Sequence, residues 1–330
     1  MSKITVIGSG SWGVALATYL AKQGNDVKIW SFSETERDQI NLERKCCFMP
    51  NLVVPENIYC TTSYEEALKD SEFILHVTPS KFVRNTIKGY KEFLTKDQVI
   101  LMCSKGFEAG TNLALDDVIE DELPGQKYGI LAGPSHAEEV SIDIPTALVI
   151  ASHDEDVRER VANVFKSPVL RIYTSKDVKG VELGGALKNI IAFCAGVSVG
   201  LELGDNTFAA LATRGLVEIA RLGTKMGGEE KTFYGLTGLG DLIVTCESEH
   251  SRNRKAGFLI GQGKTLEETK QEVGMTIESI DNIEVAHILA QKYDVEMPIV
   301  ETVYEVLHND LDPKEAVNIL MTRKLKTEKE

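Results

Sequence analysis

The sequence predicts an α/β protein, with a Rossmann-type doubly wound sheet, mainly parallel, in its N-terminal part and an all-α C-terminal domain. In the first half of the chain, short apolar runs rich in β-branched residues alternate with amphipathic segments of helical periodicity. This alternation is typical of βαβ units that build a mainly parallel sheet. From about Asp177 onward the strand patterns fade while helical patterns continue. We therefore expect a domain boundary near residues 175–190.

The expected strands are Ile4–Ile7, Val27–Trp30, Phe73–Val77, Val99–Met102, Tyr128–Leu131, Ala147–Ala151 and Leu170–Tyr173. The expected helices of the first half are Trp12–Lys22, Tyr64–Lys69, Phe82–Phe93 and Asp156–Phe165. The expected helices of the second half are Val178–Gly200, Thr207–Met226, Arg254–Ile260, Thr265–Glu272, Ile283–Lys292, Val300–Leu307 and Pro313–Met321.

Composition limits the classes of partner. The chain has 330 residues, of which 43% are hydrophobic and 26% charged, enough for two globular domains. Its net charge of −14 argues against nucleic acid and anionic membranes as partners, because both need basic surface. A small phosphorylated ligand stays compatible if a few local basic residues bind it. The six cysteines and six histidines show no CxxC motif or cluster, and no signal-peptide pattern opens the chain. We expect reduced thiols, no metal site and a cytoplasmic location.

The segment Leu183–Leu201 is long and apolar enough to raise the question of a membrane span. Lys188 and Asn189 lie inside it, where neither side chain would reach a membrane surface easily. Its glycines and alanines suit close packing of a buried helix. We therefore expect no integral membrane contact.

A glycine-rich turn follows the first strand directly. Gly8-Ser9-Gly10-Ser11-Trp12-Gly13 fits the pattern G-x-G-x-x-G and opens a helix that leads to a second strand. Gly8 would make the tight turn, Gly10 would let the backbone approach a pyrophosphate, and Gly13 would permit helix–strand packing. The alternative is a tight turn without a ligand. In this context we expect a dinucleotide-binding domain over residues 1–180 and a helical substrate-binding domain over residues 181–330.

The end of the second strand leaves the cofactor undecided between NAD and NADP. An NAD enzyme often places an acidic residue there for the ribose 2′-hydroxyl, whereas an NADP enzyme uses a basic one. The chain has Ser31-Phe32-Ser33-Glu34 instead. Either Glu34 reaches the ribose, or the two serines tolerate a 2′-phosphate, or Glu34 is an ordinary first-turn residue of the next helix.

Distinctive residues follow other predicted strands, at the edge where open parallel sheets bind ligands. Lys105 leaves an apolar strand and is expected at the rim of the crevice, although a solvated loop lysine is the alternative. Gly133-Pro134-Ser135 reads as a loop that enters a short helix, whose amides would suit an anion.

Lys188 lies between Gly-Gly-Ala-Leu and Ile-Ile-Ala-Phe, in a helix with few polar residues. Its ammonium must either extend to a domain edge or enter a polar pocket. Burial and a neighbouring cation both lower the pKa of a lysine, which makes the amine a usable acid or base near neutral pH. Transfer of a hydride at an alcohol or ketone needs such a group. Lys188 is therefore a candidate catalytic residue.

Two further polar segments follow in the helical half. A glycine-rich bend, residues 235–240, delivers Asp241 at a tightly constrained point. The segment Ser251-Arg252-Asn253-Arg254-Lys255 is the densest basic cluster in this acidic chain. It is either a solvated helix start capped by Ser251 or a phosphate clamp made by Arg252, Asn253 and the helix amides.

Taken together, six blocks resemble bacterial NAD(P)-dependent glycerol-3-phosphate dehydrogenase. They are GSGSWG (8–13), SKG (104–106), GPSHAEEV (133–140), VELGGALKNIIA (181–192), GLTGLGDLIVTC (235–246) and HSRNRKAG (250–257). The resemblance covers nearly the whole chain. It implies reduction of dihydroxyacetone phosphate to sn-glycerol 3-phosphate with NADH or NADPH, for glycerophospholipid synthesis. It also implies a homodimer with the active site between the two domains.

The resemblance assigns roles by position. Lys188 matches the family's acid/base, Lys105 is shared between substrate and cofactor, and Asp241 lines the substrate site. The other substrate positions are Gly133, Ser135, Ser251, Arg252 and Asn253. The cofactor positions are Gly8, Gly10, Ser11, Trp12, Lys105, Ala137, Arg252, Thr276 and Glu278. Two departures stand out: Phe32-Ser33 replace basic residues of many relatives, and Ser279 replaces the glycine after Glu278.

Two other functions remain to be distinguished. One is a two-domain dehydrogenase that acts on a different hydroxy acid or sugar phosphate. The other is a nucleotide sensor that binds the cofactor without oxidising it, although the two lysines and Asp241 argue against that function.

Overall fold

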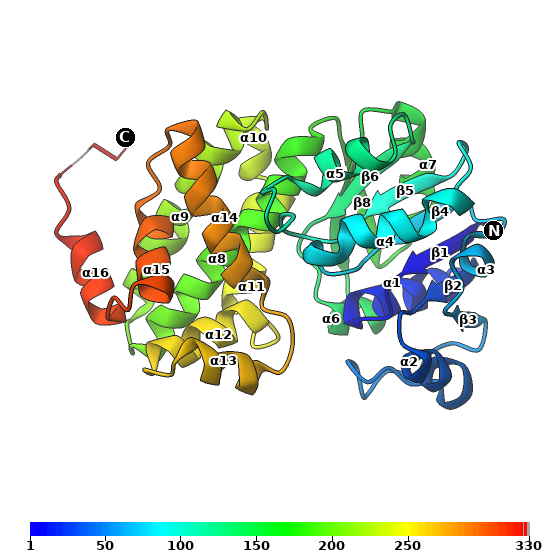
Figure 1. Ribbon diagram of the computed structural model, residues 1–330, viewed down its shortest axis with the longest axis horizontal. Coiled ribbons are helices and arrows are strands. Elements are labelled where there is room, and N and C mark those ends of the chain that lie inside the picture. The colour runs from blue at the N-terminus through cyan, green and yellow to red at the C-terminus, as the bar shows by residue number, and fades with distance from the viewer. Residues whose placement is uncertain (326, 329–330) are drawn as a thin grey trace.

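The computed structural model describes residues 1–325 and 327–328 of the chain. The N-terminal part is an eight-stranded sheet in the order β3-β2-β1-β4-β5-β6-β7-β8. Neighbouring strands are parallel except β6 and β7, which are antiparallel. The strands are β1 (Lys3–Ile7), β2 (Asp26–Trp30), β3 (Ile58–Thr61), β4 (Phe73–His76), β5 (Val99–Met102), β6 (Tyr128–Ala132), β7 (Thr146–Ala151) and β8 (Leu170–Ser175). Helices of the C-terminal part lie beside the sheet (Figure 1), which confirms the predicted fold class.

The apolar core is divided between the two faces of the sheet. On β5, Val99 and Leu101 join the core beneath α1 (Ser11–Lys22), whereas Ile100 and Met102 join the core beneath α4 (Val83–Tyr90) and α5 (Leu115–Glu122). Because helices cover both faces, the inner strands are apolar on both sides. This explains why they appear in the sequence as unbroken apolar runs.

The strand order reverses beside β1. The chain passes from β1 to β2 and β3 on one side, and then crosses to β4 on the other side of β1. The carboxyl ends of β1 and β4 therefore flank a topological switch point, where open α/β sheets bind their ligands. The Gly8–Gly13 turn follows β1 at this point.

The elements of the N-terminal part that the sequence prediction missed include strand β3 and helix α5. Strand β3 has only four residues and pairs with β2 alone, and its Tyr59 is 48% exposed. Such a short edge strand carries little periodic signal. Helix α5 is acidic, and only four of its eight side chains are buried, so its apolar pattern is too brief to register. Every strand that was predicted is present.

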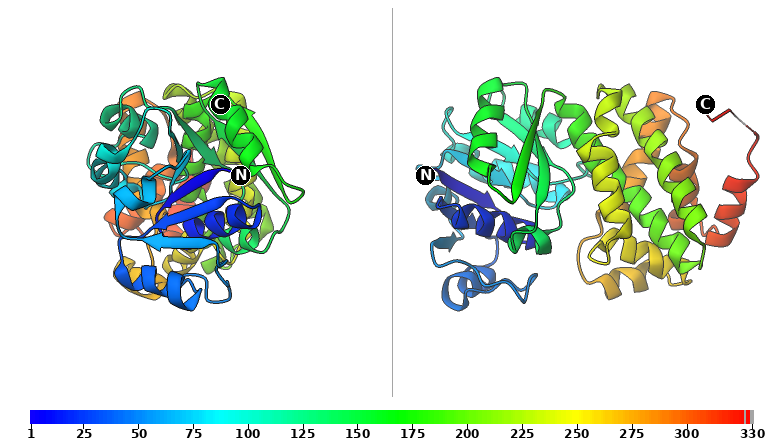
Figure 2. Two further views of the ribbon diagram at one scale, coloured as in Figure 1. Left: turned by 90° about the vertical axis from the view of Figure 1, so that its right-hand side faces the viewer. Right: turned by 180° about the vertical axis from the view of Figure 1, so that it is seen from behind.

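The C-terminal part is helical and lies at one end of the sheet, as the view from behind in Figure 2 shows. Its helices are α8 (Val178–Gly200), α9 (Asp205–Lys225), α10 (Glu230–Phe233), α11 (Asp241–Glu247), α12 (Arg252–Gly261), α13 (Leu266–Val273), α14 (Glu278–Tyr293), α15 (Pro298–His308) and α16 (Pro313–Met321). A five-residue π-helical turn, η4 (Leu236–Gly240), precedes α11. Helix α14 begins five residues before the predicted Ile283, because Glu278 and Ser279 belong to its first turn.

Helix α8 is the centre of the C-terminal core. Its backbone contacts that of α12 so closely that a Cβ on Gly257 would lie 1.8 Å from Phe193 O, and one on Gly196 would lie 2.0 Å from Arg254 O. Helix α8 is long and apolar enough to cross a membrane, but 83% of its most apolar window is buried inside the protein. It is therefore a core helix of a globular fold.

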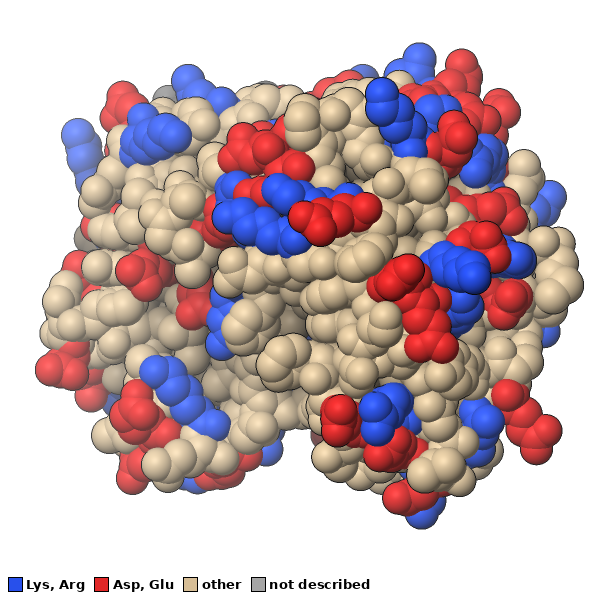
Figure 3. All heavy atoms as spheres, turned by 45° about the vertical axis from the view of Figure 1, so that its right-hand side comes forward, with Lys and Arg blue, Asp and Glu red and all other residues tan. Residues whose placement is uncertain are grey.

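Charged side chains of both signs are mixed on the molecular surface. On the face drawn in Figure 3, lysines and arginines lie among aspartates and glutamates. That face has no continuous basic surface, in keeping with the net charge of −14. The basic groups that line the cavity described below are therefore local exceptions in an acidic protein.

Candidate active site

A cavity of about 750 Å³ lies between the sheet and the helical part. Its wall combines the glycine-rich turn after β1, the loop after β5, the middle of α8, the start of α11 and the start of α12. Of the residues predicted from the sequence, the lining includes Gly8, Gly10, Ser11, Trp12, Lys105, Ser135, Lys188, Asp241, Ser251, Arg252, Asn253, Thr276 and Glu278. Gly133 and Ala137 are buried behind this wall and do not line the cavity.

The glycine-rich turn has the geometry that a dinucleotide needs. Gly8 has a φ of +123°, and a Cβ there would lie 3.0 Å from Val77 O. A Cβ on Gly13 would lie 2.1 Å from Gly8 O, so helix α1 can approach β1 only with glycine at this position. A Cβ on Gly10, by contrast, meets nothing within 4 Å, because Gly10 faces the cavity. No side chain caps α1, which leaves its first amides available to an anion.

Of the three alternatives that the sequence left open after β2, the structure favours Glu34 as an ordinary first-turn residue of the next helix. Glu34 is exposed and does not line the cavity, so it does not reach the ribose side of the wall. Glu36 lines the cavity instead, and its backbone amide donates to Ser33, which caps α2 (Glu34–Asp38). The Oε2 atom of Glu36 accepts hydrogen bonds from Ser9 Oγ and, over 3.1 Å, from Ser31 Oγ.

Two lysines meet on one carboxylate at the other end of the cavity. Lys188 Nζ donates to Asp241 Oδ1 over 2.7 Å, and Lys105 Nζ donates to Asp241 Oδ2 over 2.6 Å. Lys188 Nζ also contacts Thr245 Oγ1, which itself donates to Asp241 O over 2.6 Å. Lys188 is 4% exposed and Asp241 is 1% exposed. The sequence alone did not single out Thr245, which lies one helical turn after Asp241.

The charges of this cluster depend on one another. Burial lowers the pKa of Lys188 to about 8, although Asp241 opposes the shift, and Lys105 adds to it by repulsion. Burial alone would raise the pKa of Asp241, but the two ammonium groups outweigh it and hold that pKa below its usual value. Lys188 can therefore exchange a proton near neutral pH while Asp241 stays ionised.

Close backbone packing places Asp241 against Lys188. A Cβ on Gly184, one turn before Lys188 in α8, would lie 2.9 Å from Thr237 O in η4. A Cβ on Gly238 would lie 1.9 Å from Phe233 O, so η4 also folds tightly onto α10. The glycine-rich bend thus brings the start of α11 onto the polar side of α8.

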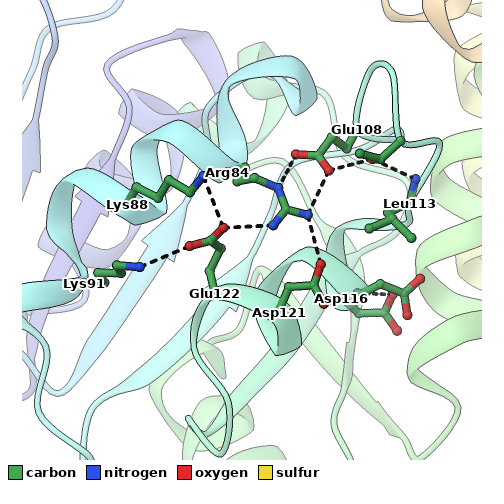
Figure 4. Close-up of polar contacts among 10 residues, drawn as sticks. Arg84, Lys88, Lys91, Glu108, Leu113, Asp116, Asp121 and Glu122 are labelled. Atoms are coloured by element: carbon green, nitrogen blue, oxygen red, sulfur yellow. Dashed lines mark hydrogen bonds and ion pairs between the residues drawn. The ribbon is translucent and has the colours of Figure 1, made fainter.

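The loop that carries Lys105 is held from two sides. Gly106 has a φ of +117°, and a Cβ there would lie 3.0 Å from Ser80 Oγ and 3.1 Å from Asn282 Oδ1. Further along the loop, Arg84 on α4 binds Glu108 through two hydrogen bonds of 2.6 and 2.9 Å (Figure 4). Arg84 also holds the pKa of the Glu108 carboxyl below its usual value. These contacts fix the course of the loop.

Arg84 is also bound to α5. Its guanidinium donates to Glu122 over 2.9 Å and to Asp121 over 3.1 Å, and Lys88 and Lys91 approach the same Glu122 (Figure 4). The network therefore joins α4, α5 and the Lys105 loop.

The start of α12 presents the basic cluster to the cavity. Ser251 caps this ten-residue helix by accepting from Arg254 N. Asn253 Oδ1 accepts from Ser279 N over 3.0 Å, which leaves its amide nitrogen for a ligand. Within the described part of the chain, Arg252 makes no hydrogen bond or ion pair. Its guanidinium is thus available to an anionic group.

Ser279 and Glu278 form the first turn of α14. Ser279 is fully buried, and its backbone amide donates to Asn253 Oδ1, whereas its side-chain hydroxyl has no hydrogen-bond partner among the described residues. Glu278 lines the cavity and accepts from Asn189 Nδ2 over 3.0 Å.

Two histidines also line the cavity. His136 and His250 have ring centroids 6.0 Å apart, and burial lowers the pKa of His136. Each lies next to a predicted substrate residue, Ser135 or Ser251, and inside one of the blocks that carry the family resemblance, which are the sequence signals that could have found them. Among the described residues, no three His, Cys, Asp or Glu side chains gather as a metal site.

Comparisons with known proteins agree with this geometry. Residues 3–158 match the family model described as the NAD-dependent glycerol-3-phosphate dehydrogenase N-terminus, and residues 177–318 match the model for its C-terminus. A glycerol-3-phosphate dehydrogenase (NAD(P)+) of Fusobacterium nucleatum is 48% identical, over 99% of each chain. One of Bacillus mycoides is also 48% identical, over 100% of this chain and 98% of its own.

Solved structures agree as well. The crystal structure of glycerol-3-phosphate dehydrogenase from Coxiella burnetii has a TM-score of 0.94 at 38% identity, and covers 98% of this chain and 99% of its own. A D-mandelate dehydrogenase, at 14% identity and a TM-score of 0.65, shares the fold alone. The chain therefore belongs to the NAD-dependent glycerol-3-phosphate dehydrogenase family.

Proposed function

We propose that the protein catalyses the reversible, NAD(P)H-dependent reduction of dihydroxyacetone phosphate to sn-glycerol 3-phosphate, which supplies glycerophospholipid synthesis. The observation that carries this proposal is the buried Lys188–Asp241–Lys105 cluster in the same cavity as the glycine-rich turn. A proton donor with a pKa of about 8 thereby faces the space that a dinucleotide would share with a small ketone. Close relatives bear the name of the same activity.

Lys188 acts as the acid in the direction of reduction. Its ammonium donates a proton to the ketone oxygen, and the neutral amine takes that proton back from the hydroxyl in the reverse reaction. The reduced nicotinamide, when bound, supplies the hydride. Asp241 holds the Lys188 amine in place through Oδ1, while Lys105 places positive charge where the carbonyl oxygen becomes negative.

The phosphate of the substrate binds at the start of α12. Arg252 offers a guanidinium without a protein partner among the described residues, and Asn253 offers its amide nitrogen. The first amides of α12 add donors and a favourable dipole for an anion. Ser135 and Ser251 complete this end of the pocket, and Gly133 supports the Ser135 loop from behind.

The cofactor, NAD or NADP, binds along the turn after β1. The open space at Gly10 and the uncapped first turn of α1, with Ser11 and Trp12, suit its pyrophosphate. Thr276 and Glu278 flank the same cavity from the helical part, and Ala137 packs behind the wall.

We further propose a cytoplasmic homodimer divided into domains at residues 1–180 and 181–330. All six cysteines are unpaired thiols, which suits a reducing compartment. The sheet ends at Ser175 and α8 begins at Val178, close to the proposed division. The dimer is inferred from the family resemblance, and sedimentation of the purified chain tests it directly.

The decisive experiment follows absorbance loss of NADH and NADPH in parallel, with dihydroxyacetone phosphate as substrate. Turnover with this substrate and little turnover with non-phosphorylated ketones is the expected result, because Arg252 needs an anionic group. Preference for a non-phosphorylated hydroxy acid would favour the alternative dehydrogenase. Cofactor binding without oxidation on any ketone would favour a nucleotide sensor.

A further inference from the structure

The end of β2 carries an ordered carboxylate that faces the proposed cofactor space. Ser31 is fully buried and Ser9 is 6% exposed, and their hydroxyl oxygens lie 2.7 Å apart. Both hydroxyls lie within hydrogen-bond distance of Glu36 Oε2. The glycine-rich turn, the end of β2 and helix α2 therefore meet at this carboxylate, and its position is fixed by the fold.

The second oxygen of Glu36 remains available to a ligand. Glu36 lines the cavity, and no residue that the structure describes donates a hydrogen bond to its Oε1 atom.

The surroundings do not neutralise this negative charge. The cations of the cavity wall are Lys105, Lys188 and Arg252, which come from the loop after β5 or from the helical part. None comes from the segment between β2 and the end of α2. The arginine beside it, Arg37, donates to Asp38 over 2.8 Å, lies 3.8 Å from Glu34 and does not line the cavity.

We propose that Glu36 makes this enzyme select NADH over NADPH, an inference that rests on the proposed function. In Rossmann-type sheets the adenosine ribose lies at the end of the second strand, where acidic residues bind its hydroxyls. The free oxygen of Glu36 accepts from a ribose hydroxyl of NADH. The same oxygen repels the 2′-phosphate of NADPH, and no basic side chain of this segment compensates for the repulsion.

The test measures binding without turnover. The chain has two tryptophans, Trp12 and Trp30, and both line the cavity, so quenching of their fluorescence reports cofactor binding to the full chain. NADH is expected to bind at least about tenfold more tightly than NADPH, since a repulsion of about 1.4 kcal/mol between like charges already amounts to a tenfold change in affinity. Raising the salt concentration should reduce this difference in affinity, because salt screens the repulsion between Glu36 and the 2′-phosphate.

Two matched variants separate the effect of the Glu36 charge on cofactor binding from that of a neighbouring charge. Glu36→Gln keeps the size and a hydrogen-bond acceptor but removes the charge. It should therefore reduce the difference in affinity between NADH and NADPH, mainly by making NADPH bind more tightly. Glu34→Gln removes a charge from the same short helix at an exposed position outside the cavity, and should leave the ratio of the two dissociation constants unchanged. A melting temperature near that of the unmodified protein shows that each variant is folded.

Equal affinity of the unmodified protein for the two cofactors would overturn the proposal, whether or not the variants fold. The proposal would also be overturned if the ratio of the two dissociation constants were the same in Glu36→Gln as in Glu34→Gln. Because no ketone is present, the result is separate from the proposed reaction. Failure to turn over dihydroxyacetone phosphate with either cofactor would overturn the proposed function and leave the binding ratio standing.

Discussion

Lys188 and Asp241 form a buried ion pair, with Lys188 Nζ 2.7 Å from Asp241 Oδ1. The pair joins the middle of α8 to the first residue of α11. Since Lys105 occupies the other carboxylate oxygen, Asp241 balances two cations with one negative charge. The cluster therefore carries an excess positive charge at the point where a ketone oxygen would become negative.

Replacing Lys188 with alanine should lower kcat by about 10²–10⁴-fold, the usual contribution of a positioned acid or base. Binding of the cofactor should change little, because the glycine-rich turn is intact. The matched control is Lys179→Ala, on the same helix, whose amine pairs with Asp116 and Asp117 outside the cavity. Steady-state kinetics and fluorescence titration of both variants give the comparison, and near-normal kcat in Lys188→Ala would remove this residue from the mechanism.

The rate should depend on pH through Lys188. Its pKa of about 8 in the ligand-free protein means that the ammonium needed for reduction is lost as the pH rises through that value, so kcat/KM for reduction should fall above about pH 8. Oxidation of glycerol 3-phosphate needs the neutral amine and should speed up over the same range. Profiles of kcat/KM against pH, measured in both directions, check these opposite trends. Parallel profiles in the two directions would contradict the assignment.

Replacing Asp241 with asparagine should shift the pH profile of the reduction. With the carboxylate gone, Lys188 loses its attractive partner while Lys105 still repels it, so the pKa of Lys188 should fall further. The decrease in the rate of reduction at alkaline pH should then begin at a lower pH, and kcat should also be lower. The quantity to compare between the variant and the unmodified protein is the pH at which kcat/KM is half-maximal. A purely structural role for Asp241 would lower kcat without moving that midpoint.

Arg252→Ala should raise KM for dihydroxyacetone phosphate by about 10- to 100-fold, as expected for loss of a charge-assisted hydrogen bond to phosphate. The control is Lys255→Ala, an exposed cation on the same helix that lies outside the cavity and contacts Glu272 O. If the two variants had the same KM, the basic cluster would be no more than a solvated helix start.

The sequence was sufficient for seven of the eight strands and for the main catalytic candidates, because both leave local signals. An inner strand is an unbroken apolar run, and a lysine inside the apolar pattern of α8 is conspicuous. Strand β3 was missed because an edge strand with an exposed tyrosine has almost no such pattern. The joining of Lys105 to Asp241, 136 positions apart, is a product of tertiary packing.

The residues missed at the site share a physical reason. Glu36 lines the cavity from the short helix α2, two positions after Glu34, whose role the sequence had left open. Thr245 enters the cluster through the helical spacing from Asp241, although the sequence around it did not predict a helix. In both cases the direction of a short helix decides which side chain faces the ligand.

The Arg84 network gives a prediction about positioning of Lys105. Arg84→Gln breaks the two hydrogen bonds to Glu108, three residues after Lys105, and leaves that 9%-exposed carboxylate without its cation. We expect a loss of about 1–3 kcal/mol in the free energy of unfolding, together with a lower kcat. Lys88→Gln is the control, because Lys88 is on the same helix and contacts Glu122 but not Glu108. Thermal melts, combined with kcat at a temperature where the variants are folded, separate the two effects. Arg84→Gln could lower the melting temperature and still have the same kcat as Lys88→Gln. In that case the network would stabilise the fold without positioning Lys105.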